Sequence, residues 1–152
     1  DISPKRVKEV SFKFYNRWNN YNITRDDAQV TNFYVSGKKK ESVKKQQDIN
    51  AAASALGNLR LSDVKPLPDL EFGKINTTET IYTTFDGLIL TITSTKLGNE
   101  KWIKISALAD KDASVHVQQE IERINNATKS WGYKVPQFVG NVIAKPLKDL
   151  IG

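Results

Sequence analysis

Residues 78–109 constrain the fold of this chain most, because their pattern is typical of antiparallel strands joined by tight turns. Asp86 and Gly87 stand between Phe85 and Leu88. An Asp-Gly pair flanked by alternating apolar residues is a strong local signal for a two-residue β-hairpin. We therefore predict a turn with positive φ at both central residues and a direct pairing of Phe85 with Leu88.

That turn dictates a register for the two strands. Thr83 is expected opposite Leu90, and Ile81 opposite Ile92, with the apolar side chains on one buried face. The other face would then bear Thr80, Tyr82, Thr84, Thr91 and Thr93. Gly98 and Asn99 predict a second turn, which leads into a strand over residues 101–108.

The rest of the chain contains further predicted strands, together with predicted helices. The predicted strands cover residues 8–15, 21–25 and 31–35, and short extended runs end at Pro66 and Pro136. The predicted helices cover residues 41–60, a segment capped by Asp112 or Ser114, and residues 137–151 interrupted at Pro146. Ile49, Ala52, Ala53, Leu56 and Leu59 give the first helix one apolar stripe.

These elements predict an α+β fold, in which antiparallel β meanders pack against two helices. At 152 residues the chain fits one domain, residues 1–152. Residues 1–68 and 78–152 follow the same order of meander, helix and proline-stopped strand. We interpret them as two similar β-meander-plus-helix modules that share one core.

Few residues of the chain are suited to catalysis or metal binding. Cysteine is absent and His116 is the single histidine, so thiol chemistry, disulfides and His clusters are excluded. Asp86 with Glu79, or Glu120 with Glu122, are the carboxylates that could act as pairs. The second two are two residues apart and do not share a helix face. We expect no catalytic residues, no metal and no cofactor, and an enzyme remains the alternative.

The net charge of +6 includes a compact basic patch. Its members are Lys38, Lys39, Lys40, Lys44 and Lys45. A nucleic acid or an anionic surface could bind such a patch. We favour a solvated loop, because the patch lacks arginine and interleaved aromatic residues. Binding to nucleic acid or to an anionic surface stays open as an alternative function.

Four aromatic residues form a candidate binding surface: Tyr82, Trp102, Trp131 and Tyr133. The last two are expected on one side of a short strand, where they anchor the end of a helix against the sheet. Packing under the helices is the competing interpretation. Exposed aromatics would instead favour a partner or a glycan.

Several segments resemble the bacterial domain-of-unknown-function family 4340. FYVSG is similar to the family's W-x-V-x-G strand, with Phe33 and Tyr34 in place of the tryptophan. AAASALGNLRLSDV resembles its A-L-x-x-L-R helix end, and FDGLILTI its central hairpin. INNATKSWGYKVPQFVGNVIAKPLKDLIG resembles the closing L-N-x-R-x-K-G-W-x-Y-x-I-P segment. The similarity covers most of the chain from about Val30.

The resemblance implies an extracytoplasmic β-rich domain, held by an N-terminal membrane anchor, and offers no catalytic residues. The chain has no methionine, so we expect an anchor or a cleaved targeting segment before Asp1. It contains no apolar run long enough to span a bilayer. The expected function is a periplasmic, non-enzymatic accessory domain of a transporter-associated protein. Its expected partner is another envelope protein, and we expect no binding to nucleic acid.

Overall fold

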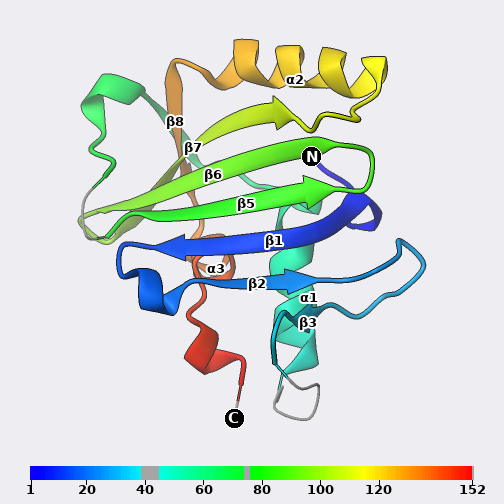
Figure 1. Ribbon diagram of the computed structural model, residues 1–152. Helices are drawn as coiled ribbons and strands as arrows, with labels where there is room; N and C mark the ends of the chain where they lie inside the picture. The colour runs from blue at the N-terminus through cyan, green and yellow to red at the C-terminus, as the bar shows by residue number, and fades with distance from the viewer. Residues whose placement is uncertain (39–44, 74–75, 152) are drawn as a thin grey trace.

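The computed structural model describes residues 1–38, 45–73 and 76–151 (Figure 1). Within them, eight strands form one antiparallel sheet. The strands are β1 (Val7–Phe14), β2 (Tyr21–Thr24), β3 (Tyr34–Val35), β4 (Asp63–Pro66), β5 (Thr78–Thr84), β6 (Leu88–Leu97), β7 (Glu100–Ala109) and β8 (Trp131–Val135). The α-helices are α1 (Gln46–Ser54), α2 (Val115–Thr128) and α3 (Gln137–Ile143). The α+β class and its β meanders are confirmed.

The sheet joins the two meanders side by side. The strand order is β3-β2-β1-β5-β6-β7-β8-β4, so β1 pairs with β5 although about sixty residues separate them. The extended run after α1 does not return to the first meander. It forms β4, which pairs with β8 at the far edge. Both halves of the sequence therefore contribute to one continuous sheet.

Helices α1 and α3 pack on one face of the sheet, behind it in Figure 1. The apolar stripe of the first helix is confirmed, because Ile49, Ala52, Ala53 and Leu56 are buried. The helix itself is shorter than predicted. It begins at Gln46 and tightens into a 3₁₀ turn, Ala55–Asn58. Its predicted start at residues 41–44 lies outside the described residues.

Helix α2 lies along the part of β7 that has no neighbouring strand. Of the two predicted N-caps, Asp112 and Ser114, the structure has Ser114, whose hydroxyl accepts a hydrogen bond from Val117 N–H at 3.3 Å. Asn125 bonds both backbone groups of Ala107, at 2.8 and 2.9 Å. The Thr128 hydroxyl donates to the Ile105 carbonyl at 3.0 Å. Side chains of α2 thus satisfy backbone groups that another strand would otherwise pair.

Strand β3 is shorter than the predicted run over residues 31–35, because side chains of α1 bind the backbone before it. Phe33 N–H donates to Asn50 Oδ1 at 3.1 Å, and Gln46 Nε2 donates to the Phe33 carbonyl at 2.8 Å. These bonds occupy the groups that a longer ladder would use. The C-terminal helix also stops early, since α3 ends at Ile143 and a 3₁₀ turn, Leu147–Asp149, follows Pro146.

The predicted register of the β5–β6 hairpin is wrong by one residue. Tyr82 lies opposite Leu90, and Thr80 opposite Ile92. The loop has three residues rather than two. Gly87 has a φ of 96°, and no non-glycine residue in the described part of the chain has a positive φ. The geometry fits a type I turn followed by a left-handed glycine, which adds one residue to the loop.

The shift also reverses the face of β5 that is buried. Thr80, Tyr82 and Thr84 lie inside, whereas Phe85 is 38% exposed. The buried hydroxyls are tolerated because each finds a partner. Tyr82 donates to the Ala52 carbonyl at 2.9 Å, Thr80 to the Ile143 carbonyl, and Thr84 Oγ1 accepts from Leu88 N–H at 2.9 Å. Burying an unpaired hydroxyl would cost free energy, so helices α1 and α3 permit this face to be the inner one.

Candidate interaction surfaces

The four aromatics proposed as one binding surface lie on different sides of the sheet. Tyr82 is fully buried on the inner face, against α1. Trp102 is on the outer face, as its alternation predicted, but it is only 1% exposed. The Lys65 ammonium lies 5.1 Å from the centre of its ring. Both residues are structural, which corrects their assignment to a contact surface.

Trp131 and Tyr133 follow the predicted arrangement more closely. They are two residues apart in β8 and therefore share the inner face. The Tyr133 hydroxyl donates to the Ala127 carbonyl at 3.3 Å, and the ring packs against the core. Trp131 is at the end of the strand and is 43% exposed. Of the four aromatics, it alone keeps a large exposed area.

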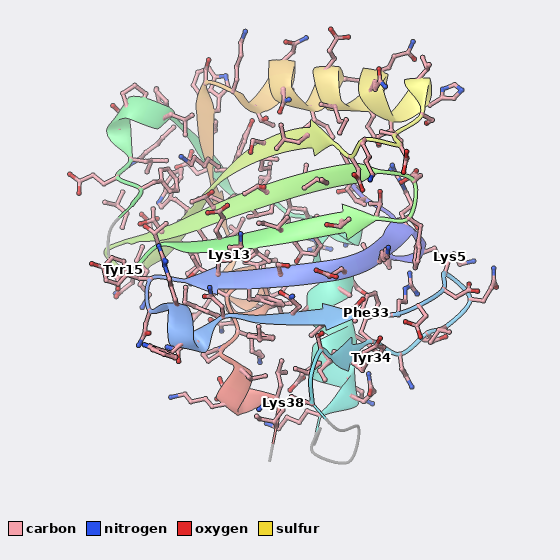
Figure 2. All side chains as sticks on the ribbon, viewed as in Figure 1. Lys5, Lys13, Tyr15, Phe33, Tyr34 and Lys38 are labelled. Carbon is pink, nitrogen blue, oxygen red and sulfur yellow. The ribbon has the colours of Figure 1, made fainter. Side chains whose placement is uncertain are left out.

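The described members of the basic patch are solvent-exposed. Lys38 follows β3 and Lys45 precedes α1, and both have exposed side chains (Figure 2 labels Lys38). Lys39, Lys40 and Lys44 lie outside the described residues. The arrangement of the five lysines as a binding site therefore stays a prediction.

An ion-pair cluster that the sequence did not reveal lies where the N-terminal segment meets α2. Arg6 donates to both carboxylate oxygens of Glu120, at 2.9 and 2.7 Å, and lies 3.1 Å from Asp86 Oδ2. The hydrogen bond from Arg6 lowers the pKa of Glu120. The same bond raises the pKa of the Arg6 guanidinium. Asp86 and Glu120 thus share one arginine, which suits a structural tie between three segments.

Arg25 lies at the same end of the sheet and is 5% exposed. Its guanidinium donates to the carbonyls of Val7, Val30, Pro4 and Lys5, at 2.8 to 2.9 Å. The rings of Phe33 and Phe85 lie 4.7 and 5.7 Å from its Cζ. Burial lowers the pKa of Arg25. We call this end, with Arg6, Arg25, Asp86 and Gly87, the hairpin end of the sheet.

The outer face of β1, β5, β6 and β7 has few charges over much of its area. Cross-strand pairing places Ser11, Ile81, Thr91 and Ser106 in one row, and Thr83, Ile89 and Leu108 in the next. These side chains are half-buried or exposed, with Leu108 at 64%. Figure 1 looks onto this face, and no helix crosses it. We call these seven residues the neutral face.

The two edges of the sheet are poor sites for adding a further strand. Leu67 N–H bonds the Ser130 carbonyl at 3.0 Å, so Val64 and Pro66, by alternation, point their backbone outward. Val64 N–H donates to Asp63 Oδ1 at 2.7 Å, and Pro66 has no N–H. Neither group is therefore free to pair with a further strand. The other edge strand, β3, has two residues. Edge strands of natural sheets are commonly blocked in these ways.

No family model, curated protein or solved structure matches this chain. Among the described residues, no helix is long and apolar enough to cross a bilayer. The same residues contain no group of three or more potential metal ligands. The candidate sites therefore rest on the geometry of this chain alone.

Proposed function

We propose that this chain is a non-enzymatic interaction domain of the bacterial cell envelope, accessory to a transporter-associated protein. The observation that best supports an interaction role is the neutral face. Charged residues make up 26% of the chain, yet this open block of the sheet has none. Depletion of charged residues is one of the compositional features that distinguish the core of a protein–protein interface from the remaining surface.

The charges around the neutral face lie at its margin. Glu9, on β1, lies at one end of the cross-strand row that contains Thr83. The row on the other side of Ile81 contains Lys13, Glu79 and Lys104. A charged rim around an apolar and hydroxyl centre is the usual anatomy of a non-obligate interface. Because both edges are blocked, a partner would contact this face through side chains rather than extend the ladder. The envelope location is supported by the resemblance to family 4340.

The enzyme alternative is less well supported by the geometry. The carboxylates that come together are Asp86 and Glu120, and both contact Arg6. A general acid needs a carboxyl whose pKa is raised, whereas the pKa of Glu120 is lowered. This cluster is therefore poorly suited to acid–base catalysis.

A crosslinking experiment tests the proposed function. A photo-reactive residue is placed at Thr91, and as a control at Gln118 on the solvent side of α2, in the protein expressed in its native host. We expect a discrete adduct with one envelope protein from Thr91, and none from Gln118. The double variant Ile81→Glu, Ile89→Glu should remove the adduct and still unfold in one cooperative transition, because both side chains lie on the outer face rather than in the core. Adducts of equal yield at both positions would contradict the proposal.

A further inference from the structure

The turn between β1 and β2 presents a tryptophan that has no packing role. Trp18 is 94% exposed, in a 3₁₀ turn, Arg17–Asn19. Asparagines hold the turn by themselves. Asn16 Oδ1 accepts from Trp18 N–H at 3.1 Å, and Asn20 Oδ1 accepts from Phe14 N–H at 2.7 Å. The indole ring is thus not needed for the shape of this turn.

Other apolar side chains are exposed at the same end of the sheet as Trp18 (Figure 1). Tyr15 is 66% exposed, and Leu97, the last residue of β6 before the β6–β7 turn, is 41% exposed. Figure 2 shows Tyr15 at the end of the sheet where that turn lies, with Lys5 at the opposite end. Large apolar side chains clustered on a surface mark a contact site more often than single ones do.

Two adjacent hollows connect Trp18 and Tyr15. One, of about 460 Å³, is lined by Phe14, Trp18, Leu147 and Lys148 among others. The second, of about 360 Å³, is lined by Tyr15, Lys96 and Lys101, and shares Phe14 and Asn19 with the first. We call this region the Trp18 end of the sheet.

Unpaired cations surround the apolar side chains. Lys96 and Lys101 lie directly opposite each other on β6 and β7, an arrangement that destabilises a sheet. Burial, together with the charge of Lys96, lowers the pKa of Lys101. None of the ion pairs in the described part of the chain includes these lysines, Arg17 or Lys148. Of the nearby carboxylates Glu79, Glu100 and Asp149, Glu100 is already bound to Lys134 at 2.6 Å.

We propose that the Trp18 end docks on the surface of an anionic phospholipid bilayer. Tryptophan and tyrosine favour the headgroup region, where the ring is apolar and its N–H or O–H remains hydrated. Lys96, Lys101, Arg17 and Lys148 would meet the lipid phosphates, and a basic group near such a surface contributes measurably to binding. Trp18 and Tyr15 are largely exposed at the turn after β1, which suits a flat bilayer better than a single-stranded nucleic acid. This surface is separate from the neutral face.

Vesicle flotation tests this proposal on the whole chain. Vesicles contain phosphatidylcholine, either alone or with 30% phosphatidylglycerol. We expect binding to the anionic vesicles that weakens with salt. Trp18→Ala should weaken it about ten-fold, the scale of burying one large side chain. Lys96→Gln should weaken it about five-fold. Phe138→Ala, at an aromatic that is 63% exposed elsewhere, and Lys5→Gln serve as matched controls and should change little.

A second measurement separates insertion from simple charge attraction. Brominated lipids should quench the wild-type tryptophan emission, and the Trp18→Phe variant should lose most of that quenching, since Trp102, although adjacent to Lys101, is buried and Trp131 lies in β8. Binding to anionic vesicles that Trp18→Ala leaves unchanged would overturn the proposal. So would equal binding to both kinds of vesicle, absence of binding, or a preference for single-stranded DNA over anionic vesicles.

Discussion

The two ends of the sheet differ in how their charged side chains are paired. At the hairpin end, Arg6 is bound to two carboxylates and Arg25 to four backbone carbonyls. At the Trp18 end, Lys96 and Lys101 oppose each other, and neither forms an ion pair with a carboxylate in the described part of the chain. The comparison indicates that most charged groups at the hairpin end stabilise the fold, whereas the opposed lysines at the Trp18 end destabilise it slightly. Strain of that kind is typical of surfaces with a function.

The largest effect is expected from Arg25 at the hairpin end. Arg25→Met keeps the apolar stem but leaves four carbonyls without their charged donor. Each lost bond to a charged group costs about 1.5–3 kcal/mol, and part is recovered from water, so we expect the free energy of unfolding to fall by roughly 3–5 kcal/mol. Urea denaturation measures this. Arg17→Met, in an exposed turn, is the control and should cost under about 0.5 kcal/mol.

Gly87 should give the next largest effect. Its φ is 96°, and a Cβ at this position would lie 2.8 Å from Ala113 Cα. Gly87→Ala therefore combines backbone strain with a contact against another backbone segment, and we expect a loss of about 2–3 kcal/mol. Gly98→Ala, at a φ of 64° with open space around the new Cβ, isolates the conformational part and should cost about 1 kcal/mol. Equal losses at the two glycines would show that the Ala113 contact has no energetic consequence.

Glu120 tests the ion-pair cluster through pH. Since Arg6 lowers the pKa of Glu120 in the folded protein, its stabilisation is present above the unfolded pKa of about 4.3 and is lost as pH falls through the lower folded value. Glu120→Gln should reduce stability at pH 7 by about 1 kcal/mol and flatten this part of the acid limb. Thermal unfolding between pH 2 and 7 gives the profile. Glu122→Gln, exposed on the same helix, should leave the profile unchanged.

The smallest effect, and the one of opposite sign, is expected at the Trp18 end. Lys96→Gln removes a cross-strand repulsion and should stabilise the protein by a few tenths of a kcal/mol. The matched change Lys8→Gln, at an exposed position of β1 near the hairpin end, should not stabilise it. A destabilised Lys96→Gln variant would remove the contrast between the two ends.

Local patterns sufficed for the existence of most elements. The α+β class, the apolar stripe of the first helix, the Ser114 cap and the Gly98–Asn99 turn between Leu97 and Glu100 all match the structure. Each of these depends on residues a few positions apart, so the interactions that form it can be predicted from a short stretch of sequence. The Trp18 end was harder to predict from the sequence. The signal that could have found it was Trp18, a large apolar residue within an asparagine-rich turn.

Tertiary structure decided which side of β5 is inside. For β5, alternation favoured Ile81, Thr83 and Phe85, but the inner face bears Thr80 and Tyr82, whose partners are the Ile143 and Ala52 carbonyls. Those partners are 63 and 30 residues away, so no local pattern could reveal that the hydroxyls would be satisfied. The burial of Trp102 and the pairing of β4 with β8 likewise depend on segments that are far apart in the sequence. The sequence by itself determined the elements because propensity and turn chemistry act locally. Burial and register were decided by contacts between distant segments, since the cost of burying a polar group depends on the partner that meets it.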